Sequence, residues 1–281
     1  MEQQHKQIRE QQKESWNKFS SGWKKWDDLA MEFMKPVGDE IIRLLEPKNG
    51  NMVLDVASGT GEPGLTIASM LTEGKVIISD LAEDMLEIAR ENAVKRGLKN
   101  IETHSCDVCE LPFPDNTFDA ISCRFGFMFF PDMEIAAKEM LRVLKPGKRI
   151  TTSVWNVPEK NFWITATMDT INNNMELPAP PPDSPGIFRC AKEGLLPDLL
   201  KQAGLKNVSQ KEIPGKLNCK TTDVYWNFIT EVAAPVVAAL GKADEATLGK
   251  IKKELFDAVN KRYPDGDVVI DSSALVIYGE K

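Results

Sequence analysis

Apolar positions between residues 51 and 155 follow two alternating patterns. Short apolar runs, typical of buried strands, recur and are separated by segments whose apolar residues fall at helical spacing. The five expected strands lie at residues 52–56, 76–78, 100–105, 118–124 and 148–155. The clearest helix between them spans 131–144 and ends at Pro146-Gly147. Strands that alternate with helices in this way predict a parallel sheet with right-handed crossovers.

The segment before the first strand has a helical pattern. Its large apolar residues from Trp16 to Phe33 recur at gaps of three and four, as on one face of a helix. We expect an interruption at residues 20–22 (Ser-Ser-Gly) and an end at Pro36, followed by a second short helix over 37–45. The residues before Trp16 are polar, and we expect them to form a tail.

The residues after Trp155 are less regular. Segments with helical spacing lie at 161–173, 192–203 and 222–262, and strand-like segments lie at 205–213 and 267–278. Residues 177–185 (LPAPPPDSP) contain too many prolines for a helix or a strand, so we expect a loop there. This region therefore adds helices and two strands to the predicted sheet.

Composition narrows the classes of function. The chain has 281 residues and a net charge of −7, without a stretch dense in Lys or Arg, which argues against a nucleic-acid or anionic-membrane surface. We expect a small-molecule acceptor as partner. No apolar stretch reaches the length of a membrane span, no signal peptide is recognisable, and five cysteines do not form a typical disulfide framework. These features predict a cytoplasmic protein without membrane insertion, and they leave the oligomeric state open.

A glycine-bearing loop follows the first strand. Residues 59–64 (GTGEPG) satisfy the spacing G-x-G-x-x-G, and Asp80 ends the next strand, where an acid would hold a ribose hydroxyl. A dinucleotide would bring an anionic pyrophosphate to this loop, but Asp55 and Glu62 would repel it. S-adenosylmethionine carries a ribose, no phosphate and a cationic end. The two acids therefore favour this cofactor over a dinucleotide.

At residues 53–61 (VLDVASGTG) the chain resembles the first motif of class I S-adenosylmethionine-dependent methyltransferases, of the ubiquinone/menaquinone-biosynthesis type (methyltransferase type 11-like). Ala57 replaces one glycine of the usual pattern. The resemblance implies an α/β fold: a Rossmann-like, doubly wound, seven-stranded, mostly parallel sheet with an antiparallel last strand and helical insertions over the substrate pocket.

The resemblance also implies a division of the chain into five parts. We expect an N-terminal helical arm (1–46), a cofactor-binding core (47–156), a helical and proline-rich insertion (157–191), a completion of the core sheet (192–221 and 263–281) and a helical cap (222–262).

The family's motifs assign roles to residues that bind the cofactor. Asp55 would bind the methionine ammonium directly or through water, Asp80 both ribose hydroxyls, and Asp107 the adenine amino group. The stripe of tryptophans either packs on the main body or folds over the cofactor, where aromatic rings suit a sulfonium. The full expected set is Asp55, Ala57, Gly59, Gly61, Asp80, Leu81, Met85, Asp107, Val108, Cys123 and Trp23.

The end of the fourth strand is the expected edge for the acceptor. Arg124 would meet the cofactor carboxylate or an acidic substrate, or else form a salt bridge at the strand end. The residues expected in the substrate pocket are Arg124, Phe127, Phe129, Trp163 and Trp226. Cys106 and Cys109 could form a redox or metal pair, but a structural zinc needs a second ligand pair, so no metal is predicted.

These features predict an S-adenosylmethionine-dependent methyltransferase for a small apolar or aromatic acceptor, quinol-like in type. Methyl transfer from a sulfonium is an in-line displacement with an activated donor, so alignment and a dry pocket supply much of the rate. No catalytic residue is predicted, and the methylated atom stays open. The alternatives are an NAD(P)-dependent oxidoreductase and a non-catalytic S-adenosylmethionine-binding protein. A nucleic-acid methyltransferase is disfavoured by the acidity of the chain.

Overall fold

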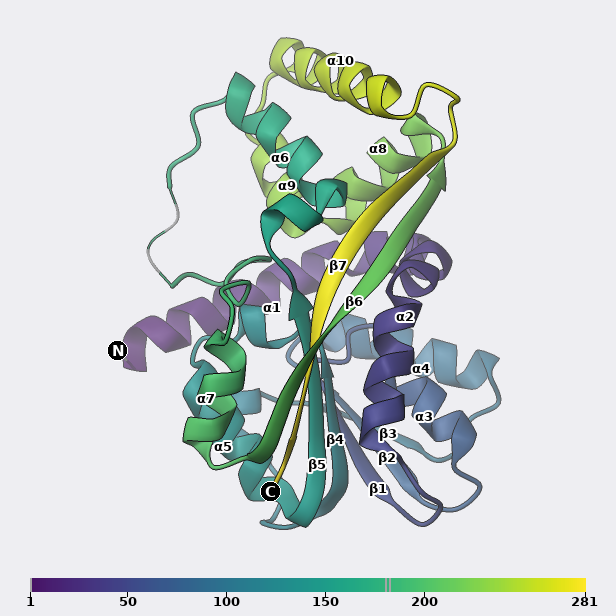
Figure 1. The fold of residues 1–281 in the computed structure, drawn as a ribbon, viewed down its shortest axis with the longest axis vertical. Helices are drawn as coiled ribbons and strands as arrows, with labels where there is room; N and C mark the ends of the chain where they lie inside the picture. Colours follow the sequence, from purple (N-terminus) through teal and green to yellow (C-terminus); the bar gives the residue numbers. More distant parts are fainter. Residues whose placement is uncertain (1, 180, 182) are drawn as a thin grey trace.

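In this computed structural model, which describes residues 2–179, 181 and 183–281, a seven-stranded sheet forms the centre (Figure 1). The strand order is β3-β2-β1-β4-β5-β7-β6. The strands are β1 (Met52–Val56), β2 (Lys75–Asp80), β3 (Ile101–Ser105), β4 (Phe118–Arg124), β5 (Leu144–Trp155), β6 (Lys206–Lys220) and β7 (Val268–Glu280). Strands β1 to β5 pair in parallel, and β7 runs antiparallel to both its neighbours. The predicted fold class is confirmed.

Helices cover both faces of the parallel part, because its central strands bury apolar side chains on both sides. On β1, Val53 joins a core with α3 (Gly64–Met70) and α4 (Glu83–Lys95), whereas Leu54 joins the larger core with α5 (Met133–Val143). Helix α7 (Leu195–Ala203) packs beside α5 on this second face (Figure 1). The alternation follows from the period-two direction of side chains along a strand.

The N-terminal helices correct three predictions. Helix α1 (Glu2–Lys25) includes the segment expected to be a polar tail, because its Gln, Glu, Lys and Arg residues favour helix. It also continues through Gly22, where a Cβ would lie 2.2 Å from the Glu231 carbonyl oxygen, so this glycine serves close packing. Helix α2 (Asp27–Leu45) does not end at Pro36, because its buried face continues beyond the proline and outweighs the lost hydrogen bond.

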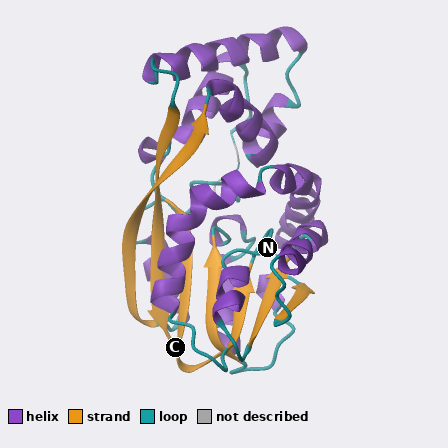
Figure 2. Ribbon diagram, turned by 90° about the vertical axis from the view of Figure 1, so that its right-hand side faces the viewer, coloured by secondary structure: helices purple, strands orange, loops and turns teal. Residues whose placement is uncertain are grey.

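Four helices form a cap beyond the carboxyl ends of the parallel strands. They are α6 (Phe162–Asn174), α8 (Thr222–Val232), α9 (Ala234–Leu240) and α10 (Glu245–Arg262). Strands β6 and β7, with 15 and 13 residues, extend past the parallel strands to reach them (Figures 1 and 2). Tyr225 in α8 donates a hydrogen bond to the carbonyl oxygen of Trp163 in α6 at 2.9 Å. The cap and the sheet share one buried core, and the five predicted segment boundaries stay predictions.

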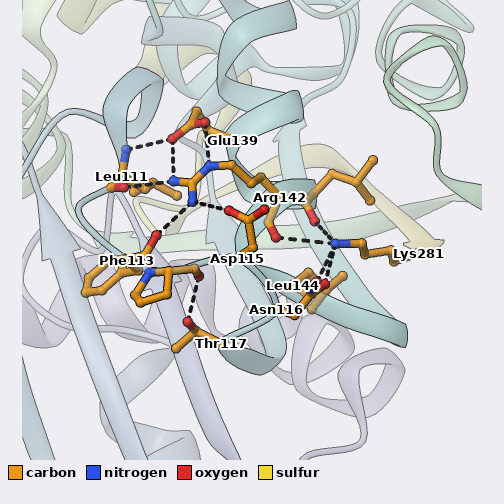
Figure 3. Close-up of polar contacts among 11 residues, drawn as sticks. Leu111, Phe113, Asp115, Asn116, Thr117, Glu139, Arg142, Leu144 and Lys281 are labelled. Atoms are coloured by element: carbon orange, nitrogen blue, oxygen red, sulfur yellow. Dashed lines mark hydrogen bonds and ion pairs between the residues drawn. The ribbon is translucent and has the colours of Figure 1, made fainter.

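The loop between β3 and β4 is held by the end of α5 (Figure 3). Arg142 donates hydrogen bonds to the carbonyl oxygens of Leu111 and Phe113 at 2.9 and 2.8 Å, and it pairs with Glu139. Lys281 donates to the Asn116 side-chain oxygen of this loop at 2.8 Å and to the carbonyl oxygen of Leu144 at 2.7 Å. These contacts fix the loop that follows the predicted adenine-binding segment.

Two further points concern the expected loop and the membrane. The predicted loop at 177–185 has no helix or strand in its described part, and residues 180 and 182 lie outside the described residues. None of the helices in the described ranges combines the length and the apolar character that crossing a membrane requires.

Candidate functional site

A cavity lies where β1, β2 and β4 end, which is the edge where open α/β sheets bind ligands. Helices α1 and α2 and the cap helices α6, α8 and α9 provide its other walls. Among the predicted cofactor residues, the cavity is lined by Trp23, Ala57, Gly59, Asp80, Leu81, Met85, Asp107 and Val108. Among the predicted acceptor residues, it is lined by Arg124, Phe129 and Trp163.

The loop after β1 has the conformation that its glycines predict. Ala57 (φ 51°), Gly59 (φ 55°) and Gly61 (φ 111°) all have positive φ. A Cβ on Gly61 would lie 2.7 Å from Leu65, so Gly61 packs against α3 and is not part of the lining. A Cβ on Gly59 would meet no atom within 4 Å, so the backbone there is open to a ligand. Ala57 holds the left-handed conformation despite its side chain, which costs about 1 kcal/mol.

Asp80 connects the end of β2 to this loop. Its Oδ2 accepts a hydrogen bond from the backbone N–H of Gly59 at 2.8 Å, and its Oδ1 accepts one from Ala82 at 2.9 Å. Burial raises the pKa of Asp80, and these backbone hydrogen bonds oppose the rise. The carboxylate is thus held in one orientation while it lines the cavity.

Asp107 lines the cavity just beyond β3, the strand that pairs with β2. Its Oδ1 accepts a hydrogen bond from the backbone N–H of Cys109 at 2.9 Å, and its Oδ2 accepts one from Arg9 in α1 at 2.8 Å. The arm helix therefore reaches the predicted adenine end of the site.

Asp55 does not line the cavity, which corrects its predicted direct contact with a ligand. Its carboxylate is fully buried, accepting hydrogen bonds from the Ser122 hydroxyl at 2.6 Å and from the Gly64 backbone N–H at 3.0 Å. Burial raises the pKa of Asp55 to about 7. The side chain points to the face of β1 that packs on α3. Asp55 therefore holds the end of the glycine loop through its buried hydrogen bond with Gly64. Cys123 is also fully buried and outside the lining.

Two predicted acceptor residues lie elsewhere. Phe127 is fully buried and packs against Phe130 with ring centroids 5.1 Å apart. Trp226 faces α10, where it packs against Phe256 and lies under the Lys252 ammonium group. Neither residue lines this cavity: Phe127 fills the core beneath the carboxyl edge of the sheet, and Trp226 packs between two cap helices.

Several aromatic lining residues were missed by sequence reasoning. Trp155 at the end of β5 stacks on Phe125, with ring centroids 4.2 Å apart, and on Phe33 of α2, with ring centroids 5.5 Å apart. Phe228 of the cap completes this wall. The signal available for Phe125 and Trp155 was their position directly at strand ends.

The tryptophan stripe supports both of its predicted roles. Trp16 and Trp23 line the cavity, whereas Trp26 donates a hydrogen bond to Glu231 at 2.8 Å and packs against Phe228. The indole N–H of Trp23 is buried and has no hydrogen-bond partner among the described residues. A buried donor without a partner is costly, so this N–H lowers stability, and it is the ring of Trp23 that lines the cavity.

Cys106 and Cys109 do not form a reactive pair. Burial raises the pKa of the Cys106 thiol to about 11 and that of Cys109 to about 12. Both thiols are therefore protonated at neutral pH, and thiolates are the form that binds metals and attacks disulfides. Within the described residues, no group of three or more His, Cys, Asp and Glu side chains could hold a metal ion.

Comparison with known proteins gives the family. The model of the ubiE/COQ5 methyltransferase family matches residues 9–164, more than half of the chain. The chain belongs to this family. The match runs from the arm helix that contacts Asp107 to the first turn of α6, and it includes the glycine loop.

Individual relatives match over the same region. The chain is 38% identical over 125 residues to the ubiquinone/menaquinone biosynthesis C-methyltransferase UbiE of Cellvibrio japonicus, and 39% identical over 123 residues to the demethylmenaquinone methyltransferase of Listeria monocytogenes. These matches cover 44% and 42% of this chain and 50% and 52% of those proteins, so the chain spans about half the length of the curated relatives it matches.

A solved structure supports the fold. The crystal structure of a SAM dependent methyltransferase from Aquifex aeolicus is 28% identical, with a TM-score of 0.51, and the match covers 68% of this chain and 89% of that one.

Proposed function

We propose that this protein transfers a methyl group from S-adenosylmethionine to a small, uncharged, aromatic acceptor. The observation that carries the proposal is that the open backbone at Gly59 and the oriented carboxylate of Asp80 line the same cavity as a wall of aromatic rings. The first two suit a nucleoside and the third suits a flat apolar acceptor. Membership of the ubiE/COQ5 family supports the same conclusion.

The residues present fit the cofactor. Asp80 would accept hydrogen bonds from the ribose hydroxyls, and Asp107 would accept one from the adenine amino group. Trp16 and Trp23 place aromatic rings in a cavity that would hold a sulfonium cation. Each group has a partner on S-adenosylmethionine.

A nicotinamide dinucleotide fits less well. Glu62 and Asp80 both line the cavity beside the glycine loop, and a pyrophosphate at that loop would face two carboxylates. Asp55 contributes less than its sequence position suggests, because it is buried behind the loop and its pKa is raised to about 7. The argument against a dinucleotide therefore depends on Glu62 and Asp80.

The acceptor side of the cavity can contribute alignment of the acceptor and exclusion of water. Its walls are apolar and largely aromatic: Phe33, Met34, Phe125, Met128, Trp155, Trp163, Phe228 and Val232. The bound cofactor supplies an activated methyl group. The protein's residues would stack the acceptor, align its reacting atom and exclude water, and neither His5 nor His104 lines the cavity. A quinol-like ring, as the names of the relatives suggest, fits these walls.

Calorimetric titration tests the proposal directly. The protein should bind S-adenosylmethionine and S-adenosylhomocysteine and should not bind NADH under the same conditions. A screen of quinols, phenols, amines and thiols, with release of S-adenosylhomocysteine as readout, should give turnover with an uncharged aromatic acceptor. Tight NADH binding would overturn the cofactor assignment. Cofactor binding without turnover on any acceptor would instead indicate a non-catalytic binding protein.

A further inference from the structure

Arg124 is a charged side chain without a charged partner. It ends β4, lines the cavity and forms no ion pair with any residue that the structure describes. Its one side-chain hydrogen bond runs from Nη2 to the Met31 sulfur atom at 3.2 Å, and a thioether is a weak acceptor. Most of the five donors of the guanidinium are therefore free to meet a ligand.

This arrangement is unfavourable without a ligand. Burial lowers the pKa of Arg124, and among the carboxylates that oppose this shift Glu62 contributes most. The Arg124 side chain is partly buried, so its guanidinium loses part of its solvation, and no hydrogen-bonded carboxylate among the described residues replaces it. An anionic group that enters the cavity would restore it.

The other charged lining residues are already held in place. Asp80 accepts backbone hydrogen bonds, Asp107 is paired with Arg9, and Glu62 pairs with Arg96. Within the described lining, Arg124 is the one cation, beside three carboxylates. Among the described lining residues, Arg124 is therefore the cation with which a bound anion would pair.

The position of Arg124 relates this cation to the glycine loop. The Thr60 hydroxyl of the loop donates a hydrogen bond to Asp27 of α2 at 2.8 Å, and Met31 lies one turn further along the same helix. The first turns of α2 therefore contact both the loop, which carries Glu62, and the guanidinium. A ligand at this point would meet a positive and a negative side chain together.

We infer that Arg124 binds the carboxylate at the methionine end of the cofactor, with Glu62 on the side of the ammonium group. This inference depends on the proposed cofactor, whose α-amino acid end carries both charges on one carbon. Because it uses the single cation of the lining, the acceptor side is left without a charged group. Arg124 would then make the protein select nucleosides that carry an amino acid over nucleosides that lack one.

The test compares two nucleosides that differ at this end. S-adenosylhomocysteine carries the amino acid, and 5′-methylthioadenosine lacks it. In calorimetry, Arg124→Met should weaken S-adenosylhomocysteine binding about 100-fold, the effect of losing a charge-assisted hydrogen-bonded pair, and should leave methylthioadenosine affinity within about twofold. The ligand-free variant should also melt at a higher temperature, because it no longer buries an unpaired charge.

Arg43→Met provides the matched control, because Arg43 lies on α2 outside the cavity and pairs with Glu40. It should leave both affinities unchanged. Equal weakening of both nucleosides by Arg124→Met would indicate a structural role and overturn the inference. So would unchanged S-adenosylhomocysteine affinity with a raised KM for the acceptor, which would assign the guanidinium to the acceptor. Failure of the unmodified protein to bind either nucleoside would overturn the proposed function itself and this inference with it.

Discussion

Arg9 in the first helix donates a hydrogen bond to Asp107 beyond β3, with Nη1 and Oδ2 2.8 Å apart, although the two residues are 98 positions apart in the sequence. The contact ties the arm to one end of the cavity. Both side chains are partly exposed, so the ion pair contributes at most about 1 kcal/mol to stability. We expect its main effect on how firmly the first turns of α1 are held against the sheet.

The first prediction follows from this contact. Arg9→Gln should accelerate amide hydrogen exchange in residues 2–16, because the first turns of α1 lose their link to the sheet, while global stability changes by less than about 1 kcal/mol. Mass spectrometry of the exchanged protein measures this. Lys6→Gln on the same helix is the control, and equal acceleration in both variants would contradict a specific role for Arg9.

Asp80 tests the nucleoside site. Asp80→Ala should weaken S-adenosylhomocysteine binding at least about 100-fold in calorimetry, because the ribose hydroxyls lose a charged acceptor. Asp84→Ala should leave the affinity unchanged, since Asp84 is exposed at the start of α4 and outside the lining. An unaltered affinity in Asp80→Ala would refute the assignment of this carboxylate to the ribose.

Asp55 predicts a pH dependence of stability. Its pKa rises from 3.8 in the unfolded chain to about 7 in the folded protein because of burial. Between these values the folded state binds a proton that the unfolded state does not, so the free energy of unfolding should fall as pH rises from about 4 to about 7, by a total on the order of 4 kcal/mol. Above pH 7 this contribution should be constant.

Asp55→Asn isolates that contribution. The amide can accept from the Gly64 N–H and donate to the Ser122 hydroxyl, so the variant keeps both contacts without a charge. Urea unfolding at pH 5 and pH 8 should show a smaller loss of stability in the variant than in the unmodified protein. Parallel losses in both proteins would mean that other groups cause the pH dependence.

Arg142 should contribute to stability through backbone contacts. Arg142→Met leaves the carbonyl oxygens of Leu111 and Phe113 without their donor, which should lower the free energy of unfolding by about 2 kcal/mol. Arg90→Met, which removes an exposed pair with Glu83, should cost less than about 1 kcal/mol. Equal effects in denaturant unfolding would show that the two carbonyl groups are satisfied by water.

Ala57 and Gly126 should be energetically coupled. A Cβ on Gly126 would lie 2.9 Å from the Ala57 Cβ and 2.7 Å from the Cys123 sulfur, so Gly126→Ala should destabilise by about 1–3 kcal/mol through overpacking. Ala57→Gly removes one of these contacts and relieves the positive φ. The double variant should therefore recover part of the loss, with a coupling energy above about 0.5 kcal/mol. Strict additivity in thermal unfolding would contradict the contact.

The parallel strands and the glycine loop could be predicted because their information is local. Apolar runs at β1, β2 and β4 are buried on both faces and bounded by turn residues, so their sequence suffices to place them. The first two helices were less predictable. Pro36 and Gly22 are helix-weakening residues by local rules, and burial against the rest of the protein overrides both.

The sequence by itself determined the fold class, the position of the glycine loop and the acid that ends β2. Only the tertiary structure decided which residues near the strand ends face the cavity: Asp80 does and Asp55 does not, Phe125 and Trp155 do and Phe127 does not. It alone showed that Arg124 has no carboxylate partner among the described residues. The physical reason is that a chain's periodicity depends on neighbours in sequence, whereas the exposure and pairing of a side chain depend on distant segments packed against it.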